Sequence, residues 1–527
     1  MTPGQSDTAP ADLPRRWQVA IVSAAAIAFA CKILLALRTY GTNDVYAWER
    51  FAHWSALFGS GLYTVDAAFN HPPSMVHVLS AMTWLSKTTG IFFPFWLRLP
   101  AILADTASLW VVSRIFARRL HEPSVCWALL LLALSPTLIL VSGFHGNTDP
   151  VVMLFVLLSV WLTQKSAGGG DTADWTSGAA FGAAMCVKVL PVIVLPVLFF
   201  CRPGVRRRTV FLSSAAAVML VCWSPYLFRD PRAISHQVLG YQSIYGHWGL
   251  SWVVCHLTFF RDSWHDAFQH YGSYVTLSMI AAAAWAVNRR ELKPTVYAQA
   301  GAALFFFLAT ANGFGVQYLA WLVPWTVGLG MITVTFFAAA SGAFLFLVYN
   351  WWSGGFPWYL ADSEYVGDFT PHLDYFLTVC WISVIVLARS AWRRQPVTWP
   401  TFRTRALLSV LAIPVFIYPA WNQYANVDAR KYPASADHAA VATVHADEYA
   451  MLSKAYYKMG RYADAVVAAR TGIALDPQVP GAWNNLATAC IRMGRWDEAL
   501  NAAENAIRLA PEDATANANI EELQSRR

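Results

Sequence analysis

Charged side chains are scarce in this chain. Only 13% of its 527 residues are Asp, Glu, Lys or Arg, whereas 57% are hydrophobic. Soluble globular domains carry about 25% charged residues. The composition therefore excludes an ordinary soluble protein and predicts an all-α chain with several membrane-spanning helices.

Cysteine is sparse as well. The chain has eight cysteines, mostly within apolar runs, and no Cys-x-x-Cys pair. Neither a disulfide framework nor a zinc site is predicted from this pattern. The net charge of +7 comes from 38 basic and 31 acidic residues. Because the basic residues gather at the ends of apolar runs, they indicate membrane topology and do not indicate a nucleic-acid partner.

Apolar runs predict about 13 membrane-spanning helices within a domain that covers residues 17–422. They lie at 17–37, 94–116, 124–142, 149–165, 175–187, 188–201, 209–228, 273–288, 296–311, 316–330, 331–349, 375–390 and 405–422. The first run follows a cytoplasmic segment, 1–16, and has no signal-peptide cleavage site, so we expect it to be retained. The runs at 175–187 and 188–201 are short for a membrane core of about 30 Å and predict broken or tilted helices.

The basic clusters predict the orientation. Residues 118–119, 206–208, 289–290 and 393–394 would face the cytoplasm together with the N-terminus. The opposite face would carry a long first loop, 38–93, with a helix around 75–85 lying along the membrane interface. An odd number of spans then places the C-terminal tail outside. The composition is typical of a bacterial protein and predicts the inner membrane.

The tail contains a repeat. Gly460 and Gly494 are 34 residues apart, and the same offset relates Tyr462 to Trp496, Ala465 to Ala499, Pro477 to Pro511 and Leu452 to Leu486. This period predicts tetratricopeptide repeats at about 449–482 and 483–516, in a domain at 445–527 that follows a linker at 423–444. Two repeats are fewer than the usual three, so the domain is expected to bind a protein or peptide partner, or to be extended by residues 428–446. A stabilising cap is the alternative.

Several ionisable residues fall within or between apolar runs. Arg98 and Asp105 are seven residues apart and would share one helix face. Each costs about 3 kcal/mol in lipid, so both are expected to face the bundle interior, where Asp105 could equally form a structural ion pair. Lys188 separates two short runs, a setting that suits a phosphate head group. Its alternative is to extend toward the interface.

Polar residues also gather in the predicted outer loops. Residues 144–150 read Phe-His-Gly-Asn-Thr-Asp-Pro and predict a tight turn between two spans. Asp149 could cap the following helix, whereas His145 and Asn147 would be available to a ligand. Gln317 and Tyr318 open a later span from the outer side and could bind a sugar or phosphate. Trp321, three residues on, is expected to be an interface anchor.

Six segments together resemble the GT-C superfamily of membrane glycosyltransferases, which use sugars linked to polyprenyl phosphate. The nearest likeness is to the catalytic subunit of GPI mannosyltransferase I and its bacterial relatives. The segments are 42–46 with Phe51, 71–73, 99–114 with Asp105, 146–149, 188–191 and 317–324. Within 42–46 the chain has one acid, Asp44 beside Asn43, where that mannosyltransferase has two. A bound metal is therefore not expected.

The resemblance implies an inverting transfer of a sugar, mannose by analogy, from a polyprenyl-phosphate donor to an acceptor hydroxyl on the outer face. Asp44 would be the base. The donor phosphate or sugar would be bound by Lys188, Arg98, His145, His71, Gln317 and Tyr318, with Asn43, Asn147, Asp149 and Asp105 in support. The lipid-linked sugar is a substrate and no cofactor is expected. The acceptor would be a glycan, a glycolipid or a protein.

A non-catalytic membrane protein is the alternative function. A transporter, or a scaffold that recruits partners through its tail, would use Arg98, Asp105 and Lys188 to line a pathway. The membrane part shows no internal repeat of the kind found in many transporters. A transporter would also move its substrate without consuming a lipid-linked sugar.

Overall fold

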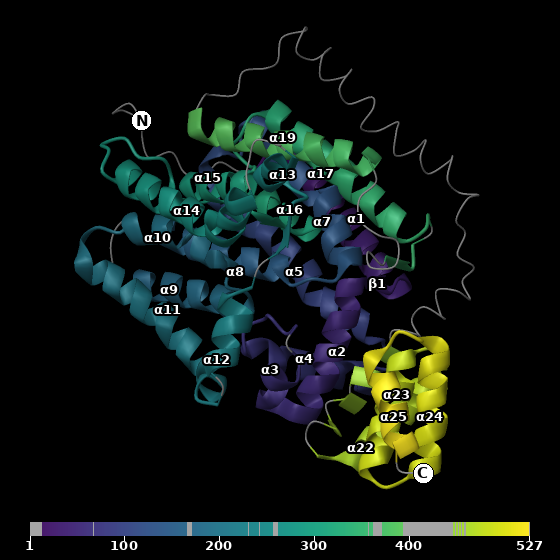
Figure 1. Cartoon of the computed structure of the whole chain (residues 1–527). Helices are drawn as coiled ribbons and strands as arrows, with labels where there is room; N and C mark the ends of the chain where they lie inside the picture. The colour runs from purple at the N-terminus through teal and green to yellow at the C-terminus, as the bar shows by residue number, and fades with distance from the viewer. Residues whose placement is uncertain are drawn as a thin grey trace. The chain divides into compact units, whose positions relative to one another are not determined.

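The chain divides into two compact units, Met1–Ala429 and Arg430–Arg527 (Figure 1). The computed structural model describes residues 13–393, with gaps at 67, 166–170, 230, 242, 257–261, 357 and 362–370. It also describes residues 446–525, with gaps at 448, 452, 455 and 458–459. The predicted span at 405–422 and the predicted linker at 423–444 lie outside the described residues.

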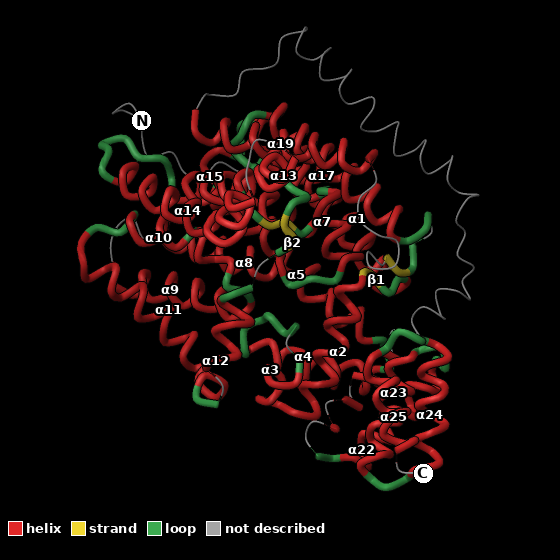
Figure 2. The backbone as a smooth tube through the Cα atoms, in the orientation of Figure 1, coloured by secondary structure: helices red, strands yellow, loops and turns green. Residues whose placement is uncertain are grey.

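The described elements are almost entirely helical (Figure 2). In the first unit the long helices are α1 Arg15–Arg38, α2 Asn43–Phe58, α4 Ser74–Thr89, α5 Phe93–Ile115, α6 Pro123–Ala133, α8 Asp149–Lys165, α9 Asp171–Val187, α11 Gly204–Leu227, α14 Asp262–Asn288, α15 Val296–Thr310, α17 Met331–Trp352 and α19 Pro371–Arg393. The shorter ones are α3 Leu62–Val65, α7 Pro136–Leu140, α10 Leu195–Phe200, α12 Pro231–Ile234, α13 Gly249–His256, α16 Leu319–Leu322 and the π-helical turn η3 Val141–His145. The expectation of an all-α membrane protein is confirmed.

The strands in the described part of the chain are two residues long and join distant segments. β1 Gly41–Thr42 pairs in parallel with β4 Leu360–Ala361. β2 Ile244–Tyr245 pairs antiparallel with β3 Gly313–Phe314. The first of these pairs ties the loop after α1 to the loop after α17.

Six helical segments in the described residues are long and apolar enough to cross a membrane. They are Arg15–Arg38, Phe93–Ile115, Pro123–His145, Gly204–Leu227, Met331–Trp352 and Leu373–Trp392. The predicted number of 13 is not confirmed, because several expected spans are short or interrupted. The region 175–201 consists of α9, a break at Lys188, the 3-10 turn Leu190–Ile193 and α10. Helix α4 has 16 residues, about 24 Å, and is too short to span.

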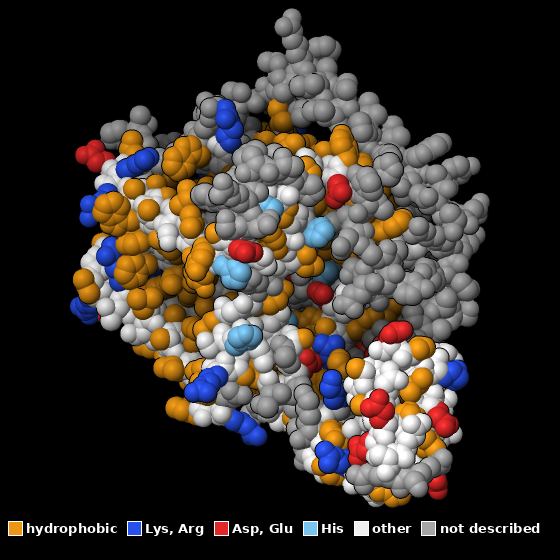
Figure 3. Space-filling model, viewed as in Figure 1, with side chains coloured by type: hydrophobic (Ala, Val, Ile, Leu, Met, Phe, Trp, Pro, Cys, Tyr) orange, Lys and Arg blue, Asp and Glu red, His pale blue; other side chains and the backbone are white. Residues whose placement is uncertain are grey.

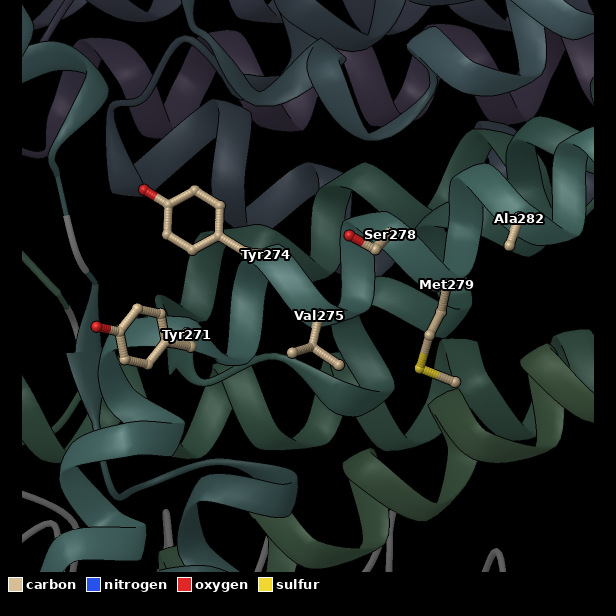
Figure 4. A pocket seen from close by; sticks show the side chains of 6 residues that line it. All are labelled: Tyr271, Tyr274, Val275, Ser278, Met279 and Ala282. Carbon is tan, nitrogen blue, oxygen red and sulfur yellow. The ribbon is translucent and has the colours of Figure 1, made fainter.

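The surface of this unit carries many apolar side chains. Hydrophobic residues cover much of the face around α9, α11 and α14 in Figure 3. Exposed examples are Val205, Leu220 and Val221 on α11 and Tyr271, Tyr274, Val275 and Met279 on α14. The α14 residues line a shallow groove of about 490 Å³ that includes none of the predicted site residues (Figure 4). Such exposure is expected where helices face lipid.

A buried ion pair joins the first two predicted spans. Lys32 Nζ on α1 donates to Asp105 Oδ2 on α5 at 2.5 Å, and each side chain is 6% exposed. Ser142 Oγ in η3 donates to the same carboxylate oxygen at 2.6 Å. Asp105 therefore forms the structural ion pair that was one of its two predicted roles. No sequence pattern predicts Lys32 as its partner.

The second unit contains helical hairpins with the predicted period. Its described long helices are α22 Tyr462–Leu475, α23 Pro480–Arg492, α24 Trp496–Leu509 and α25 Ala514–Ser525. Gly460 and Gly494 precede α22 and α24 with φ values of +74° and +70°, which glycine adopts without strain. Small side chains such as Ala465, Ala487 and Ala499 are fully buried where the helices pack. The repeat prediction is borne out by this arrangement.

The buried ion pair between Lys32 and Asp105 predicts that the stability of the fold depends on both charges. Replacing Lys32 with Met, or Asp105 with Leu, leaves the other charge unpaired and should cost about 3–5 kcal/mol. The double variant removes both charges and should recover most of that loss. Thermal unfolding of the four proteins in detergent measures the difference. A double variant no more stable than either single variant would contradict the ion-pair role.

Candidate active site

Asp44 lies at the start of α2, which is anchored through the preceding residue, Thr42. Helix α2 begins at Asn43, directly after β1, so Asp44 is in its first turn. A carboxylate there is stabilised by the helix dipole. Thr42 Oγ1 donates to the backbone oxygen of His145 at 2.8 Å, and this bond anchors the helix start to η3.

One oxygen of Asp44 is occupied and the other is open. The imidazole Nε2 of His145 lies 3.0 Å from Asp44 Oδ2, and Asn147 Nδ2 donates to the same oxygen at 3.2 Å. Among the described residues, Oδ1 accepts no hydrogen bond. The Asp44 side chain is 38% exposed, whereas His145 is buried. The carboxylate is therefore held through Oδ2, and Oδ1 has no hydrogen bond to the described residues.

A glycine allows the turn that carries His145 and Asn147. Gly146 ends η3 with φ +83°, and a Cβ there would lie 2.5 Å from Val45 Cγ2. Any other residue would strain the backbone and push α2 away. The other ring nitrogen of His145, Nδ1, lies 3.0 Å from the hydroxyl of Tyr349 on α17. His145 is thus held from both sides.

A second cluster surrounds Asp149. Its Oδ1 accepts hydrogen bonds from Lys188 Nζ at 2.8 Å and from Trp321 Nε1 at 2.9 Å. Its Oδ2 is buried and has no partner. Asp149 is the first residue of α8 and binds these two side chains, so it serves as the partner of Lys188. Trp321 is buried and is not the interface anchor that was expected.

Lys188 occupies the break between α9 and the following 3-10 turn. Its ammonium group lies 5.5 Å from the ring centre of Tyr318 and 6.0 Å from that of Trp321. These two rings stack on each other at 4.0 Å. The broken helix therefore places one ammonium group against a carboxylate and an aromatic wall, which together lower the cost of burying its charge.

His71 lies in the same site as Asp44 and Lys188 and interacts electrostatically with both. Its ring stacks on Trp48 of α2 at 4.1 Å, and its Nδ1 is buried without a partner. Burial, assisted by the positive charge of Lys188, lowers the pKa of His71 to about 3, although Asp44 opposes the shift. At neutral pH the ring is uncharged and Nδ1 is free to accept or donate one hydrogen bond.

The two clusters form one electrostatic site. Burial by itself raises the pKa of Asp44, but His145, Lys188 and His71 together lower it below its usual value. Asp44 is therefore ionised at neutral pH. Lys188 influences both Asp44 and His71, so the three groups respond to one another. In the described part of the chain no three His, Cys, Asp or Glu side chains are grouped as metal ligands.

Three further predicted residues, Arg98, Gln317 and Asn43, make none of the contacts within these two clusters. Arg98 on α5 is fully buried and donates to the backbone oxygens of Thr39, Tyr40 and Gly143 and to Thr39 Oγ1. It holds the end of α1 against η3. Gln317 is half-buried and its side chain makes no hydrogen bond to other described residues. Asn43 is half-buried at the first position of α2.

Tyr349 and Trp48 are two residues of the site that were not predicted from the sequence. Tyr349 lies near the end of an apolar span in which nothing marks it as functional. Trp48 lies four residues beyond Asp44 on α2, a spacing that places the two on one side of the helix. That spacing was the available signal for Trp48. No comparable signal pointed to Tyr349.

Comparison with protein families now gives two matches. Residues 69–311 match glycosyltransferase family 87, and residues 450–514 match a tetratricopeptide repeat family. Residues 69–311 of the membrane unit are therefore similar to a glycosyltransferase family, and the tail contains tetratricopeptide repeats. The first match includes His71, His145, Asp149 and Lys188 but not Asp44. The likeness to a mannosyltransferase is not confirmed.

Comparison with solved structures gives crystal structures of ArnT from Cupriavidus metallidurans. The apo form has 17% identity and a TM-score of 0.40, covering 78% of this chain and 75% of that one. The form bound to undecaprenyl phosphate has 16% identity and a TM-score of 0.41, covering 88% and 80%. No curated protein sequence matches.

The low pKa of His71 predicts a pH-dependent stability. Between the ordinary value of 6.5 and about 3, the unfolded chain binds a proton that the folded chain does not. Stability should therefore fall as the pH falls through this window, by at most about 1.4 kcal/mol per pH unit. His71→Gln removes this contribution, so its unfolding temperature should approach that of wild type on acidification. His121→Gln, at an exposed position, is the control. A difference that stays constant from about pH 7.5 to about pH 4.5 would contradict the assignment.

Proposed function

We propose that the membrane unit transfers a sugar from a polyprenyl-phosphate donor to an acceptor hydroxyl, with Asp44 as the base. The observation that carries this proposal is the geometry of Asp44. Its Oδ2 is held by His145 and Asn147, while its Oδ1 is open and its carboxylate is ionised. A fixed carboxylate with one free oxygen is suited to accept a proton from a bound hydroxyl.

The proposed reaction is a single displacement at the anomeric carbon. The acceptor oxygen forms a bond to this carbon while the bond from the carbon to the phosphate oxygen breaks. The acceptor proton moves to Asp44 Oδ1, and the electron pair leaves with the polyprenyl phosphate. The configuration of the anomeric carbon is inverted. Since a phosphate is a good leaving group, the site needs charge stabilisation there more than protonation.

Lys188 and His71 are the proposed ligands of that phosphate. Lys188 uses one of its three N–H groups on Asp149, so two remain for an anion. His71 has an unpartnered Nδ1, and Tyr318 forms an aromatic wall beside Lys188. Mannose as the sugar, and Gln317 and Tyr318 as its ligands, rest on the resemblance of the sequence. So do the outer face, the inner membrane and a glycan, glycolipid or protein acceptor.

We assign Arg98, Asp105 and Asn147 to support of the site. Asn147 orients the Asp44 carboxylate, and Arg98 holds backbone oxygens of the loops that carry Asp44 and His145. Asp105 is paired with Lys32. The transporter alternative needs Arg98 and Asp105 to line a pathway. Both are buried, and their charges are used in contacts with the protein, which favours the enzyme.

The first test is the removal of the base. Asp44→Asn keeps the shape of the side chain and should lower kcat by about 10²–10⁴-fold, with little change in the KM of the donor. The assay is transfer from radiolabelled polyprenyl-phosphate mannose, and from other sugars, into a membrane extract. Glu122→Gln, which breaks a surface ion pair with Arg119, is the matched control. Normal transfer by well-folded Asp44→Asn would show that the base lies elsewhere.

The second test concerns the phosphate. Lys188→Met keeps the aliphatic part of the side chain and removes the charge. The KM of the donor, and the inhibition constant of free polyprenyl phosphate, should rise by about 10- to 100-fold, as for loss of a charged hydrogen bond of roughly 1.5–3 kcal/mol. Lys165→Met, at the other end of α8, should leave both unchanged. Equal inhibition of Lys188→Met and wild type would rule out this phosphate site.

A further inference from the structure

Tyr349 contacts His145, the histidine that holds the candidate base. It lies on α17, is fully buried, and its hydroxyl lies 3.0 Å from His145 Nδ1. Its ring packs against Phe144 at 5.3 Å and Trp358 at 6.1 Å, which restricts its rotation. The hydroxyl is therefore aimed at one atom of one histidine.

The hydrogen bonds on either side of His145 fix the position of its proton. Asp44 is ionised, so its Oδ2 can only accept, and His145 Nε2 must carry the hydrogen between them. In a neutral imidazole the other nitrogen, Nδ1, is then an acceptor. With a neutral ring, the Tyr349 hydroxyl is then the donor to Nδ1. The bonds run in one direction, from Tyr349 through His145 to Asp44.

We propose that Tyr349 is a positioning residue, which keeps the His145 hydrogen on Nε2 and thereby holds the Asp44 carboxylate with Oδ1 open. This inference rests on the proposed function only in assigning the base to Asp44. Without the hydroxyl, His145 gains a competing state with its hydrogen on Nδ1. In that state a lone pair on Nε2 faces the carboxylate and repels it, so Asp44 turns away from its position.

Two further groups act on Asp44. They are the ammonium group of Lys188, from the end of α9, and the ring of His71, from the loop before α4. Tyr349→Phe leaves both in place. Any change in the titration of Asp44 in this variant therefore reports the His145 contact.

The experiment measures the tautomer and the kinetics of the same proteins. In ¹⁵N NMR of histidine-labelled protein, the His145 signals are assigned by their loss in His145→Gln. Wild type should show a hydrogen on Nε2 and an acceptor at Nδ1, whereas Tyr349→Phe should show a mixture of tautomers. The Tyr349→Phe enzyme should lose about tenfold in kcat, with the KM of the donor within about twofold. The acid limb of its pH–rate profile should move to higher pH, because Asp44 loses a donor.

The control is Tyr297→Phe, which also removes a buried tyrosine hydroxyl, here donating to the backbone oxygen of Pro324 at 2.6 Å. It should leave the tautomer, kcat and pH profile unchanged. In the His145→Gln background, Tyr349→Phe should cause no further loss of kcat. A loss of the same size in both backgrounds would mean that Tyr349 acts independently of His145, and would overturn the inference.

Two outcomes separate this inference from the proposed function. If Asp44→Asn is inactive while Tyr349→Phe matches Tyr297→Phe in tautomer and kinetics, the positioning role is wrong and the base assignment stands. If Asp44→Asn transfers normally but Tyr349→Phe shifts the His145 tautomer, the base assignment is wrong and the hydrogen-bond direction stands. An unshifted tautomer in Tyr349→Phe overturns the inference whatever the activity.

Discussion

The hydrogen bond between Asp44 and His145 is the contact on which the arrangement of the site depends. It joins two residues that are 101 positions apart in the sequence. Tyr349, which is another 204 positions along the chain, contacts the same histidine. Two glycines permit this approach. A Cβ at Gly41 would lie 2.7 Å from the Phe144 backbone oxygen, and one at Gly146 would lie 2.5 Å from Val45. The carboxylate can meet the imidazole only because the two backbones carry no side chains where they touch.

The polar residues around this contact are of two kinds: some support the backbone, and others keep hydrogen-bonding groups unused. Arg98 and Asp105 are buried beneath the site, where their charges are neutralised or bound by the protein itself. Lys188 and His71 retain unused hydrogen-bonding capacity. Burial of a polar group without a partner is costly, so such groups persist mainly where a ligand supplies the partner. The supporting residues make the backbone rigid, and the others are left for a substrate.

The sequence predicted the residue types of the site better than their pairings. Asp44 follows the first span and Lys188 lies between two short apolar runs. Ionisable side chains are costly in such positions, and this cost made both residues candidates. The partner of Lys188 did not follow, since Asp149 could also have capped a helix. Trp321 contacts Asp149, 172 positions earlier in the sequence, and Tyr349 contacts His145, 204 positions earlier. Local periodicity carries no information about contacts between such distant residues. The predicted number of 13 spans is not confirmed for a related reason: apolar runs do not reveal where a helix breaks.

The charges of the site also limit how a donor can bind. Asp44 and Asp149 carry two negative charges against the one positive charge of Lys188, so an incoming phosphate meets no net positive charge. Its binding depends on the N–H groups that Lys188 keeps free and on His71. Burial is the main cause of the low pKa of His71, so the ring stays uncharged and its Nδ1 can form one hydrogen bond to the phosphate. Lys188 therefore supplies the positive charge of the site, while the hydrogen bonds from His145 and Asn147 keep Asp44 fixed as the acceptor of a proton.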